Sequence, residues 1–292
     1  MDIVITYVDG NDPVWKRDYE QYTNVPVMQK RFRDWGTLKY LLRGIDVCMP
    51  FIRNVYLVVS HPSQVPQWAD AENLKIVLHK DIIPEEYLPT FNSTTIEMFL
   101  HCIDGLDEQF IYFNDDIFPV QPCKAENFFK DGRAIVGMSR HLLATSMYKK
   151  HVRRSDRMAR EALGLKKKCS FLRVQHSCIP ALKSQCAEVA ELQREAVCSS
   201  LSRVRNDGNI NMTLFLSYMY HKSLVENRRQ SCKHISLAAV TQSKLETSIS
   251  DPSKYMLCIN DVKLSEEKFQ SYRELIVDMF EKRFPSKSRF EK

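Results

Sequence analysis

The chain has 292 residues, of which 44% are hydrophobic and 27% are charged. This length and composition predict a folded protein with a substantial core, so disorder is not the default expectation. No apolar run approaches the roughly 20 residues that cross a bilayer, and the N-terminus lacks the features of a secretory signal. We therefore expect a cytoplasmic protein whose nine cysteines, scattered and without a CxxC pair, are reduced thiols.

The net charge of +6 conceals two oppositely charged halves. Residues 1–148 carry 14 Lys/Arg against 20 Asp/Glu, whereas residues 149–292 carry 28 against 16. One interpretation is that carboxylates of the first half hold a metal while cations of the second half meet phosphates or an anionic surface. The alternative is two solvated faces of opposite sign.

The first half of the chain alternates predicted strands with predicted helices. Short β-branched and aromatic runs predict strands, and longer runs with apolar residues at helical spacing predict helices. Strands are expected at residues 2–8, 54–60, 73–79 and 110–113, and helices at residues 35–45 and 93–103, the second capped by Ser93. This alternation predicts an α/β fold with a mostly parallel sheet flanked by helices.

The second half is predicted to be mostly helical. Residues 147–173 contain ten Lys/Arg, which favours a helical, solvent-facing segment. Further helices are expected at residues 179–198, 211–220 and 266–283, and residues 233–240 are expected to return a strand to the sheet. We therefore divide the chain into an α/β core, residues 1–140 and 231–292, and a helix-rich basic subdomain, residues 141–230.

Acidic residues follow two of the predicted strands. Asp9 and Asp12 lie just after the first strand, and Asn114, Asp115 and Asp116 follow the strand at residues 110–113. Ligands of parallel sheets bind beyond the carboxyl ends of the strands, where short carboxylates hold a hard cation that bridges a diphosphate. The alternative is that both segments are ordinary polar turns.

Three other segments carry candidate residues. Arg31 and Arg33 suit phosphate oxygens, and the aromatic residues beside them could stack on a base; surface arginines at a helix start are an equal alternative. His176 alone would more often be structural than catalytic. Arg205, in the polar turn at residues 203–209, could stabilise a transferring phosphate. The chain has no GxSxG, P-loop or GxGxxG motif, which disfavours hydrolase, ATPase and dinucleotide-binding functions.

Taken together, these segments resemble the Stealth family, which includes bacterial capsular polysaccharide phosphotransferases and the animal enzyme that adds N-acetylglucosamine 1-phosphate to lysosomal glycans. The four family blocks are matched in order by residues 2–13, 31–116, 175–180 and 204–210. The chain ending, residues 258–261 and 284–291, is also similar. Asn209 stands where the family usually has aspartate, and residues 149–173 match no block.

The resemblance implies a glycosyltransferase-A-like core that binds a UDP-sugar and a divalent cation, Mg²⁺ or Mn²⁺. An acceptor hydroxyl of a glycan would attack the phosphorus bonded to the sugar, and UMP would leave. Asp116 and His176 would activate the hydroxyl, and Arg205 would stabilise the phosphoryl charge. The resemblance assigns the metal to Asp115 and Asp116, and substrate binding to Asp9, Asp12, Arg31, Arg33, Asn114 and Asn209.

Two other functions are open at this point. An ordinary glycosyltransferase of the same fold would release UDP, and a nucleic-acid-binding protein would use the basic segment. We disfavour nucleic acid as a partner because the basic segment lacks interleaved aromatic residues and a known reading module. We expect instead that residues 149–173 hold the enzyme at the inner face of the anionic membrane, near a lipid-linked acceptor.

Overall fold

A five-stranded sheet forms the centre of the computed structural model, which describes the backbone of residues 1–292 and all side chains except those of Gln29 and Ala239. Its strand order is β10-β4-β1-β2-β3. The strands are β1 (Asp2–Thr6), β2 (Val55–Val59), β3 (Leu74–Leu78), β4 (Gln109–Asn114) and β10 (Ile179–Leu182). Strands β1 to β4 are mutually parallel and β10 is an antiparallel edge, so the predicted α/β fold with a mostly parallel sheet is confirmed.

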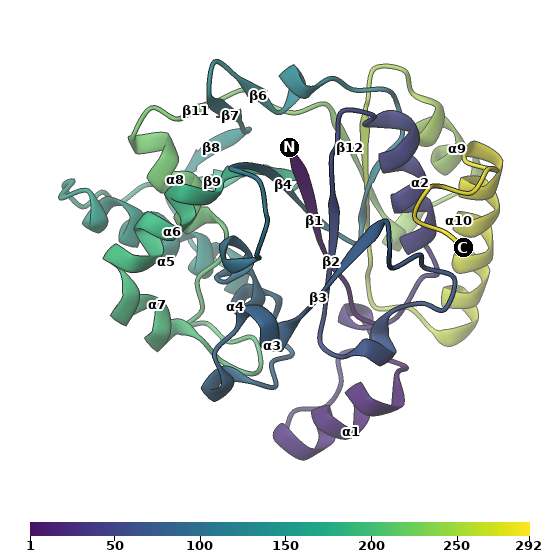
Figure 1. Ribbon diagram of the computed structural model, residues 1–292, viewed down its shortest axis with the longest axis horizontal. Coiled ribbons are helices and arrows are strands. Elements are labelled where there is room, and N and C mark those ends of the chain that lie inside the picture. The colour runs from purple at the N-terminus through teal and green to yellow at the C-terminus, as the bar shows by residue number, and fades with distance from the viewer.

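Helices lie on both sides of this sheet (Figure 1). Both faces of the sheet are covered, which explains why β2 is buried at every residue and reads as a continuous apolar run. One group, on the left of Figure 1, comprises α5 (Met147–Ala162), α6 (Lys183–Leu192), α7 (Arg194–Ser200) and α8 (Thr213–His221). The other group comprises α2 (Leu38–Cys48), α9 (Gln242–Ser250) and α10 (Glu266–Arg283).

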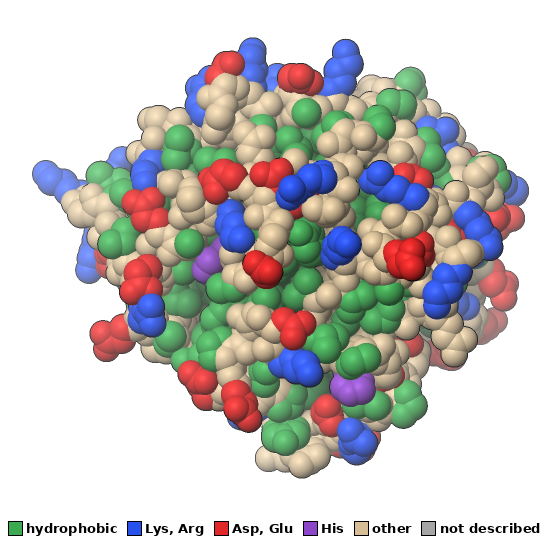
Figure 2. Space-filling view, in the orientation of Figure 1, with side chains coloured by type: hydrophobic (Ala, Val, Ile, Leu, Met, Phe, Trp, Pro, Cys, Tyr) green, Lys and Arg blue, Asp and Glu red, His purple; other side chains and the backbone are tan. Residues whose placement is uncertain are grey.

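The remaining elements are short. At the bottom of Figure 1, α1 (Pro13–Tyr22) extends away from the central sheet, and α3 (His79–Ile82) and α4 (Ser93–Glu97) lie above it to the left. One small sheet consists of β6 (Phe129–Lys130), β7 (Arg133–Ile135) and β11 (Val225–Glu226). Another consists of β8 (Met138–His141) and β9 (Phe171–Val174). Across the described part of the chain, no helix combines the length and apolar character needed to cross a membrane. On the face shown in Figure 2, acidic and basic side chains are interspersed.

A three-stranded sheet adjoins the central sheet, and its strand order shows that one prediction was wrong. Strand β12 (Cys232–Ser236) does not return to the central sheet, as was expected for residues 233–240, but pairs in parallel with β13 (Met256–Asn260). Strand β13 pairs in turn with β5 (Ile117–Pro119). Strand β5 follows β4 directly in the chain, but it lies outside the central sheet and pairs with β13. The turn between β4 and β5, Asp115-Asp116, therefore joins the two sheets.

Two helix predictions were also wrong in part. The segment 179–198 begins as β10, because its short apolar start pairs with the free edge of β4 before the helices α6 and α7 begin. The predicted helix at 93–103 stops at Glu97, and its N-cap is Asn92, whose side chain accepts a hydrogen bond from the backbone N–H of Thr94 at 3.2 Å. The basic segment forms α5 but ends in β9, whereas α10 spans the predicted residues 266–283.

The strand β10 lies within the segment 141–230 yet completes the central sheet. The two parts of the chain thus share hydrogen bonds through β10 and β4. The division into a core and a basic subdomain stays a proposal.

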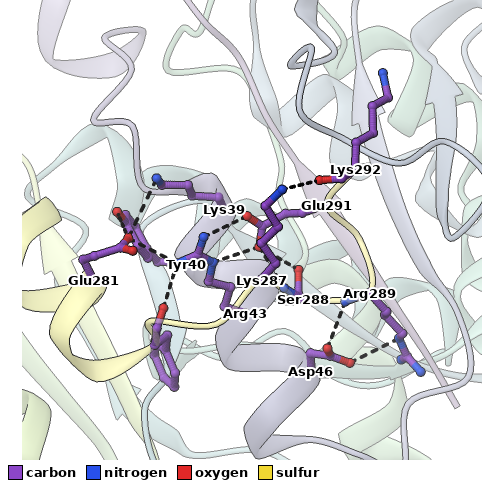
Figure 3. A network of polar contacts seen from close by, with 11 residues as sticks. Lys39, Tyr40, Arg43, Asp46, Glu281, Lys287, Ser288, Arg289, Glu291 and Lys292 are labelled. Carbon is purple, nitrogen blue, oxygen red and sulfur yellow. Dashed lines mark hydrogen bonds and ion pairs between the residues drawn. The ribbon is translucent and has the colours of Figure 1, made fainter.

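The C-terminal segment is fixed by Arg43 of α2 (Figure 3). The Nε and Nη2 atoms of Arg43 donate to the two carboxylate oxygens of Glu291 at 2.8 and 2.9 Å, and Nη1 donates to the Phe284 carbonyl at 2.8 Å. Nη1 also donates to Glu281 of α10 at 3.1 Å. The side chains of Arg43 and Glu291 are only 6% and 5% exposed. One buried guanidinium therefore ties α2 to α10 and to the end of the chain.

We expect Arg43→Met to lower the free energy of unfolding by about 3–5 kcal/mol, because it leaves the buried Glu291 carboxylate without its cation. Lys282→Met is the matched control, since Lys282 pairs with Asp278 on the exposed surface of α10 and such pairs contribute about 1 kcal/mol or less. Urea denaturation of the wild type and both variants measures the losses. Equal losses for Arg43→Met and Lys282→Met would show that Arg43 does not fix the C-terminus.

Candidate active site

A cleft of about 360 Å³ opens at the carboxyl ends of β1 and β4. The parallel pairing of these strands brings their following loops to one edge of the sheet, as predicted. The residues that line the cleft include Tyr7, Trp15, Arg31, Phe32, Arg33, Asp34, Asn114, Asp115, Asp116, Arg205 and Asp261. They come from segments far apart in the sequence, and most of their side chains are polar.

His176 contacts Asp116 beside this cleft. The His176 Nε2 atom lies 3.3 Å from Asp116 Oδ2, although the two residues are 60 positions apart. Strand β10 explains the contact: it begins three residues after His176 and runs antiparallel to β4, so its register carries His176 to the end of β4, where Asp116 lies. Burial opposes a positive charge on the imidazole, but the hydrogen bond and charge of Asp116 outweigh it and raise the pKa of His176.

Four carboxylates line the cleft within electrostatic range of Asp115: Asp115 itself, Asp34, Asp116 and Asp261. Burial, reinforced by the charges of Asp116 and Asp34, raises the pKa of Asp115 to about 7. Burial likewise raises the pKa of Asp34 and of Asp261. The Oδ1 atom of Asp116 is buried without a hydrogen-bond partner among the described residues. Crowded oxygen donors with an unused oxygen suit a hard divalent cation, so the residues present fit the expected metal.

Arginines supply the opposite charge. Arg31 and Arg205 both line the cleft, and burial together with the positive charge of Arg205 lowers the pKa of Arg31. Two guanidinium groups near each other repel unless an anion lies between them, so this pair favours a phosphate. The cleft thus offers cations and carboxylates together, as a metal-bound diphosphate requires.

Hydrogen bonds to neighbouring segments hold the loop that carries Arg205. The Arg205 guanidinium donates to the Ser93 hydroxyl at the start of α4. Asn209 is buried, and its side chain donates to the Ser200 carbonyl at 2.7 Å and accepts from the Asn206 backbone N–H at 2.7 Å. Asn209 therefore shapes the loop and does not line the cleft.

Three other predicted substrate-binding residues have structural contacts. The Asp12 carboxylate accepts a hydrogen bond from the Trp15 backbone N–H at 2.7 Å and caps α1, and Asp9 accepts one from the Asn11 N–H at 2.8 Å. Neither Asp9 nor Asp12 lines the cleft. Arg33 does line it, but its Nε lies 3.1 Å from Asp261 and its guanidinium stacks on Phe269 at 4.9 Å.

The aromatic residues close to Arg31 and Arg33 in the sequence also make contacts within the protein. Phe32 packs on Trp15, with ring centroids 4.8 Å apart, and the Trp35 indole donates to Asp261 at 3.1 Å. Asn114 lines the cleft, and its Oδ1 accepts a hydrogen bond from the Tyr112 hydroxyl at 2.8 Å. Of the predicted residues, the structure therefore brings together Arg31, Arg33, Asn114, Asp115, Asp116, His176 and Arg205.

Sequence reasoning missed Asp34, Glu97, Cys258 and Asp261. Glu97, at the end of α4, is a buried carboxylate that accepts a hydrogen bond from the Met212 backbone N–H at 3.0 Å. Burial raises its pKa to about 7, against the opposing influence of Arg205 and His176. Its only signal in the sequence is a single acidic residue between apolar neighbours, Ile96 and Met98.

Glu97→Gln is expected to weaken the pH dependence of stability. The carboxyl of Glu97 has an ordinary pKa of 4.5 and a folded-state pKa of about 7, so between these values the folded protein keeps a proton that the unfolded chain releases. The free energy of unfolding therefore falls as the pH rises through this range, by up to about 3 kcal/mol from this group. The glutamine amide oxygen can still accept from Met212, so the variant should lack this fall.

Urea denaturation of the wild type and Glu97→Gln at pH 5 and pH 7.5 tests this, with the exposed Glu20→Gln as control. The difference in stability between Glu97→Gln and the wild type should grow in favour of the variant at the higher pH. A difference that stays constant would contradict a raised pKa at Glu97.

Comparison with known proteins finds relatives that cover most of this chain. Residues 31–136 match the family profile of Stealth protein CR2, conserved region 2. The capsular polysaccharide phosphotransferase WcwK of Streptococcus pneumoniae is 30% identical, over 100% of this chain and 99% of that protein. The capsular polysaccharide phosphotransferase cps12A of Actinobacillus pleuropneumoniae is 30% identical, over 95% of this chain and 80% of that protein. One of Actinobacillus suis is 42% identical, over 48% of this chain and 40% of that protein.

Among solved structures, the galactosyltransferase LgtC in complex with donor and acceptor sugar analogues aligns with 97% of this chain and 96% of its own, at 11% identity and a TM-score of 0.45. The relatives that span the whole chain define its class: it is an enzyme, a phosphotransferase. The chain belongs to the Stealth family.

Proposed function

We propose that this enzyme transfers a sugar 1-phosphate from a UDP-sugar, such as a UDP-N-acetylhexosamine, to a glycan hydroxyl and releases UMP in capsular or cell-surface polysaccharide synthesis. The observation that carries the proposal is the contact between His176 and Asp116, beside a cleft that also presents Arg31 and Arg205. A proton acceptor, a phosphate-binding arginine pair and crowded carboxylates are the parts that phosphoryl transfer uses.

His176 would accept the proton of the acceptor hydroxyl. When Nε2 of its imidazole donates to Asp116, the Nδ1 atom keeps a lone pair for that proton, and Asp116 stabilises the imidazolium that forms. The hydroxyl oxygen then attacks the phosphorus that bears the sugar, and the bond from this phosphorus to the UMP oxygen breaks. Arg205, and with it Arg31, would stabilise the negative charge on the phosphoryl oxygens.

A divalent cation, Mg²⁺ or Mn²⁺, would be held by Asp115 and Asp116, with Asn114 shaping the donor site next to them. The unpartnered Oδ1 of Asp116 and the raised pKa of Asp115 support this placement. When bound, the cation would neutralise the charge of the diphosphate and of the leaving UMP. Asp34 and Asp261, which line the same cleft, would complete its negative surroundings.

A nucleotide product assay tests the proposal. The protein is incubated with UDP-N-acetylhexosamines, Mg²⁺ or Mn²⁺ and a capsular oligosaccharide acceptor, and the nucleotides are separated. Acceptor-dependent release of UMP is the expected result. Exclusive release of UDP would mean that the enzyme is an ordinary glycosyltransferase.

We also propose that the basic segment holds the enzyme at an anionic membrane, close to a lipid-linked acceptor. Three exposed arginines of α5, Arg153, Arg154 and Arg157, form no ion pair within the described part of the chain. Two leucines just before α5, Leu142 and Leu143, are 67% and 71% exposed. Cations beside exposed apolar side chains suit an anionic lipid surface. Flotation with phosphatidylglycerol vesicles should be lost when the three arginines become glutamine; equal binding by both proteins would rule the contact out.

A further inference from the structure

The sulfur of Cys258 lies against the proposed catalytic pair. Cys258 belongs to β13 and is fully buried, and its Sγ lies 3.7 Å from Asp116 Oδ2. The same carboxylate oxygen lies 3.3 Å from His176 Nε2. The three donor atoms all fall within 4.8 Å of one another. A thiol, an imidazole and a carboxylate thus converge from three separate elements on one small volume.

The two separations measured from Asp116 Oδ2 match those of a tetrahedral zinc site. Zinc lies at about 2.3 Å from sulfur and about 2.0–2.1 Å from nitrogen or oxygen, which places neighbouring ligand atoms of a tetrahedron roughly 3.3–3.7 Å apart. From Asp116 Oδ2, His176 Nε2 lies at 3.3 Å and Cys258 Sγ at 3.7 Å, the two ends of that range, and the nitrogen and the sulfur lie within 4.8 Å of each other. Asp116 is therefore placed to share a metal ion with either of the other two side chains.

The donor set also discriminates between metals. Mg²⁺ and Mn²⁺ prefer oxygen ligands, which Asp115 and Asp116 supply, whereas thiolate and imidazole ligands select Zn²⁺. The Cys258 thiol contacts the Asp116 carboxylate from β13, where the Ile259 backbone N–H donates to the Asp116 carbonyl at 2.9 Å. Asp116 is common to both sets, so the two metals would compete for it.

We propose that Asp116, His176 and Cys258 form an inhibitory Zn²⁺ site, in which water fills the fourth position. Binding displaces the thiol proton of Cys258 to solvent and forms the zinc–thiolate bond, so the affinity falls as the pH is lowered. The bound ion occupies the imidazole nitrogen and carboxylate oxygen that otherwise face each other. Inhibition rests on the proposed function, because it requires that His176 and Asp116 carry the reaction. Zinc binding itself does not depend on the proposed function.

Cobalt substitution tests the site without any activity measurement. Chelator-treated protein, kept reduced, is titrated with Co²⁺, and one equivalent should produce a near-ultraviolet sulfur-to-cobalt charge-transfer band that one equivalent of Zn²⁺ abolishes. All nine cysteines are free thiols, so the band must be assigned by substitution. Cys258→Ser should lose it, whereas Cys186→Ser, equally buried in α6, should keep it. A wild type without the band, or a band that survives in Cys258→Ser, would overturn the site.

A second variant guards against misfolding of Cys258→Ser. His176→Asn leaves β13 unchanged and removes the imidazole ligand. Even an outer-shell partner is worth roughly 10- to 100-fold in metal affinity, so loss of this ligand should weaken Co²⁺ binding at least tenfold. Unchanged affinity in His176→Asn would contradict the site.

Inhibition is measured on sugar-phosphate transfer with Mg²⁺ present. Zn²⁺ should inhibit the wild type and Cys186→Ser, and Cys258→Ser should need at least about tenfold more Zn²⁺ for the same inhibition. Equal inhibition of the wild type and Cys258→Ser would overturn the inhibitory role. If no transfer is found in any protein, the proposed function fails while the cobalt band still decides whether the metal site exists.

Discussion

His176→Ala is expected to slow sugar-phosphate transfer by about 10²–10⁴-fold, the usual contribution of a positioned general base. The imidazole lies 3.3 Å from Asp116, and this contact raises its pKa, which strengthens it as a proton acceptor. Removal of the ring takes away the proton acceptor and leaves Asp116 without its partner. Initial rates of acceptor-dependent UMP release measure the loss.

The matched control is His234→Ala. His234 lies on β12 with its ring stacked on that of His176, the centroids 6.0 Å apart, but it is exposed and forms no hydrogen bond with Asp116 among the described contacts. We expect His234→Ala to keep most of the activity. Comparable losses in both variants would mean that the stacked pair matters for packing and that His176 is not the base.

Arg205→Ala is expected to lower the rate by about 10²–10³-fold, the cost of removing one donor that stabilises transition-state charge. Arg205 lines the cleft and its guanidinium is oriented by Ser93, so the cation is already in place before substrate binds. Arg205→Lys should recover only part of the loss, because an ammonium lacks the planar fork of arginine. The loss should appear in kcat.

Arg203→Ala is the control within the same loop. Arg203 is exposed, donates to the Leu88 carbonyl at 3.1 Å and lies over the Tyr22 ring, outside the cleft. Its replacement should leave kcat nearly unchanged. If both arginine variants lose activity equally, the loop as a whole is required and Arg205 has no particular role in catalysis.

Local patterns were sufficient for most of the central sheet. The runs at residues 2–8, 54–60, 73–79 and 110–113 contain the observed strands or most of their residues, since a parallel sheet covered on both faces demands continuous apolar segments. Strand β10 was missed because four apolar residues before a helix do not reveal whether they belong to that helix. Strand β12 belongs to the second sheet, whose position is set by the pairing of β13 with β5. The residues of β12 alone do not reveal this pairing.

The site was predictable only in part. The acids after β4 follow from the strand pattern, but the partnership of Asp116 with His176 depends on the register of β10 and was expected from family resemblance alone. Asp12 and Asn209 have side chains that suit a ligand, yet both serve the backbone, as a helix cap and as a loop brace. Asp34, Glu97 and Asp261 were missed because isolated carboxylates are common on surfaces and only burial sets them apart.

Transfer of a sugar 1-phosphate requires that the bond from phosphorus to the UMP oxygen breaks while the bond from the anomeric carbon to its oxygen remains intact. A UDP-sugar labelled with ¹⁸O at the oxygen between the sugar and the β-phosphorus tests it directly, because contaminating phosphatases do not move this label. Mass spectrometry should find the ¹⁸O in the sugar-phosphate diester formed on the acceptor. Label that leaves entirely with UDP, in a reaction that joins the sugar to the acceptor without phosphorus, would show that the enzyme breaks the anomeric C–O bond and transfers no phosphate.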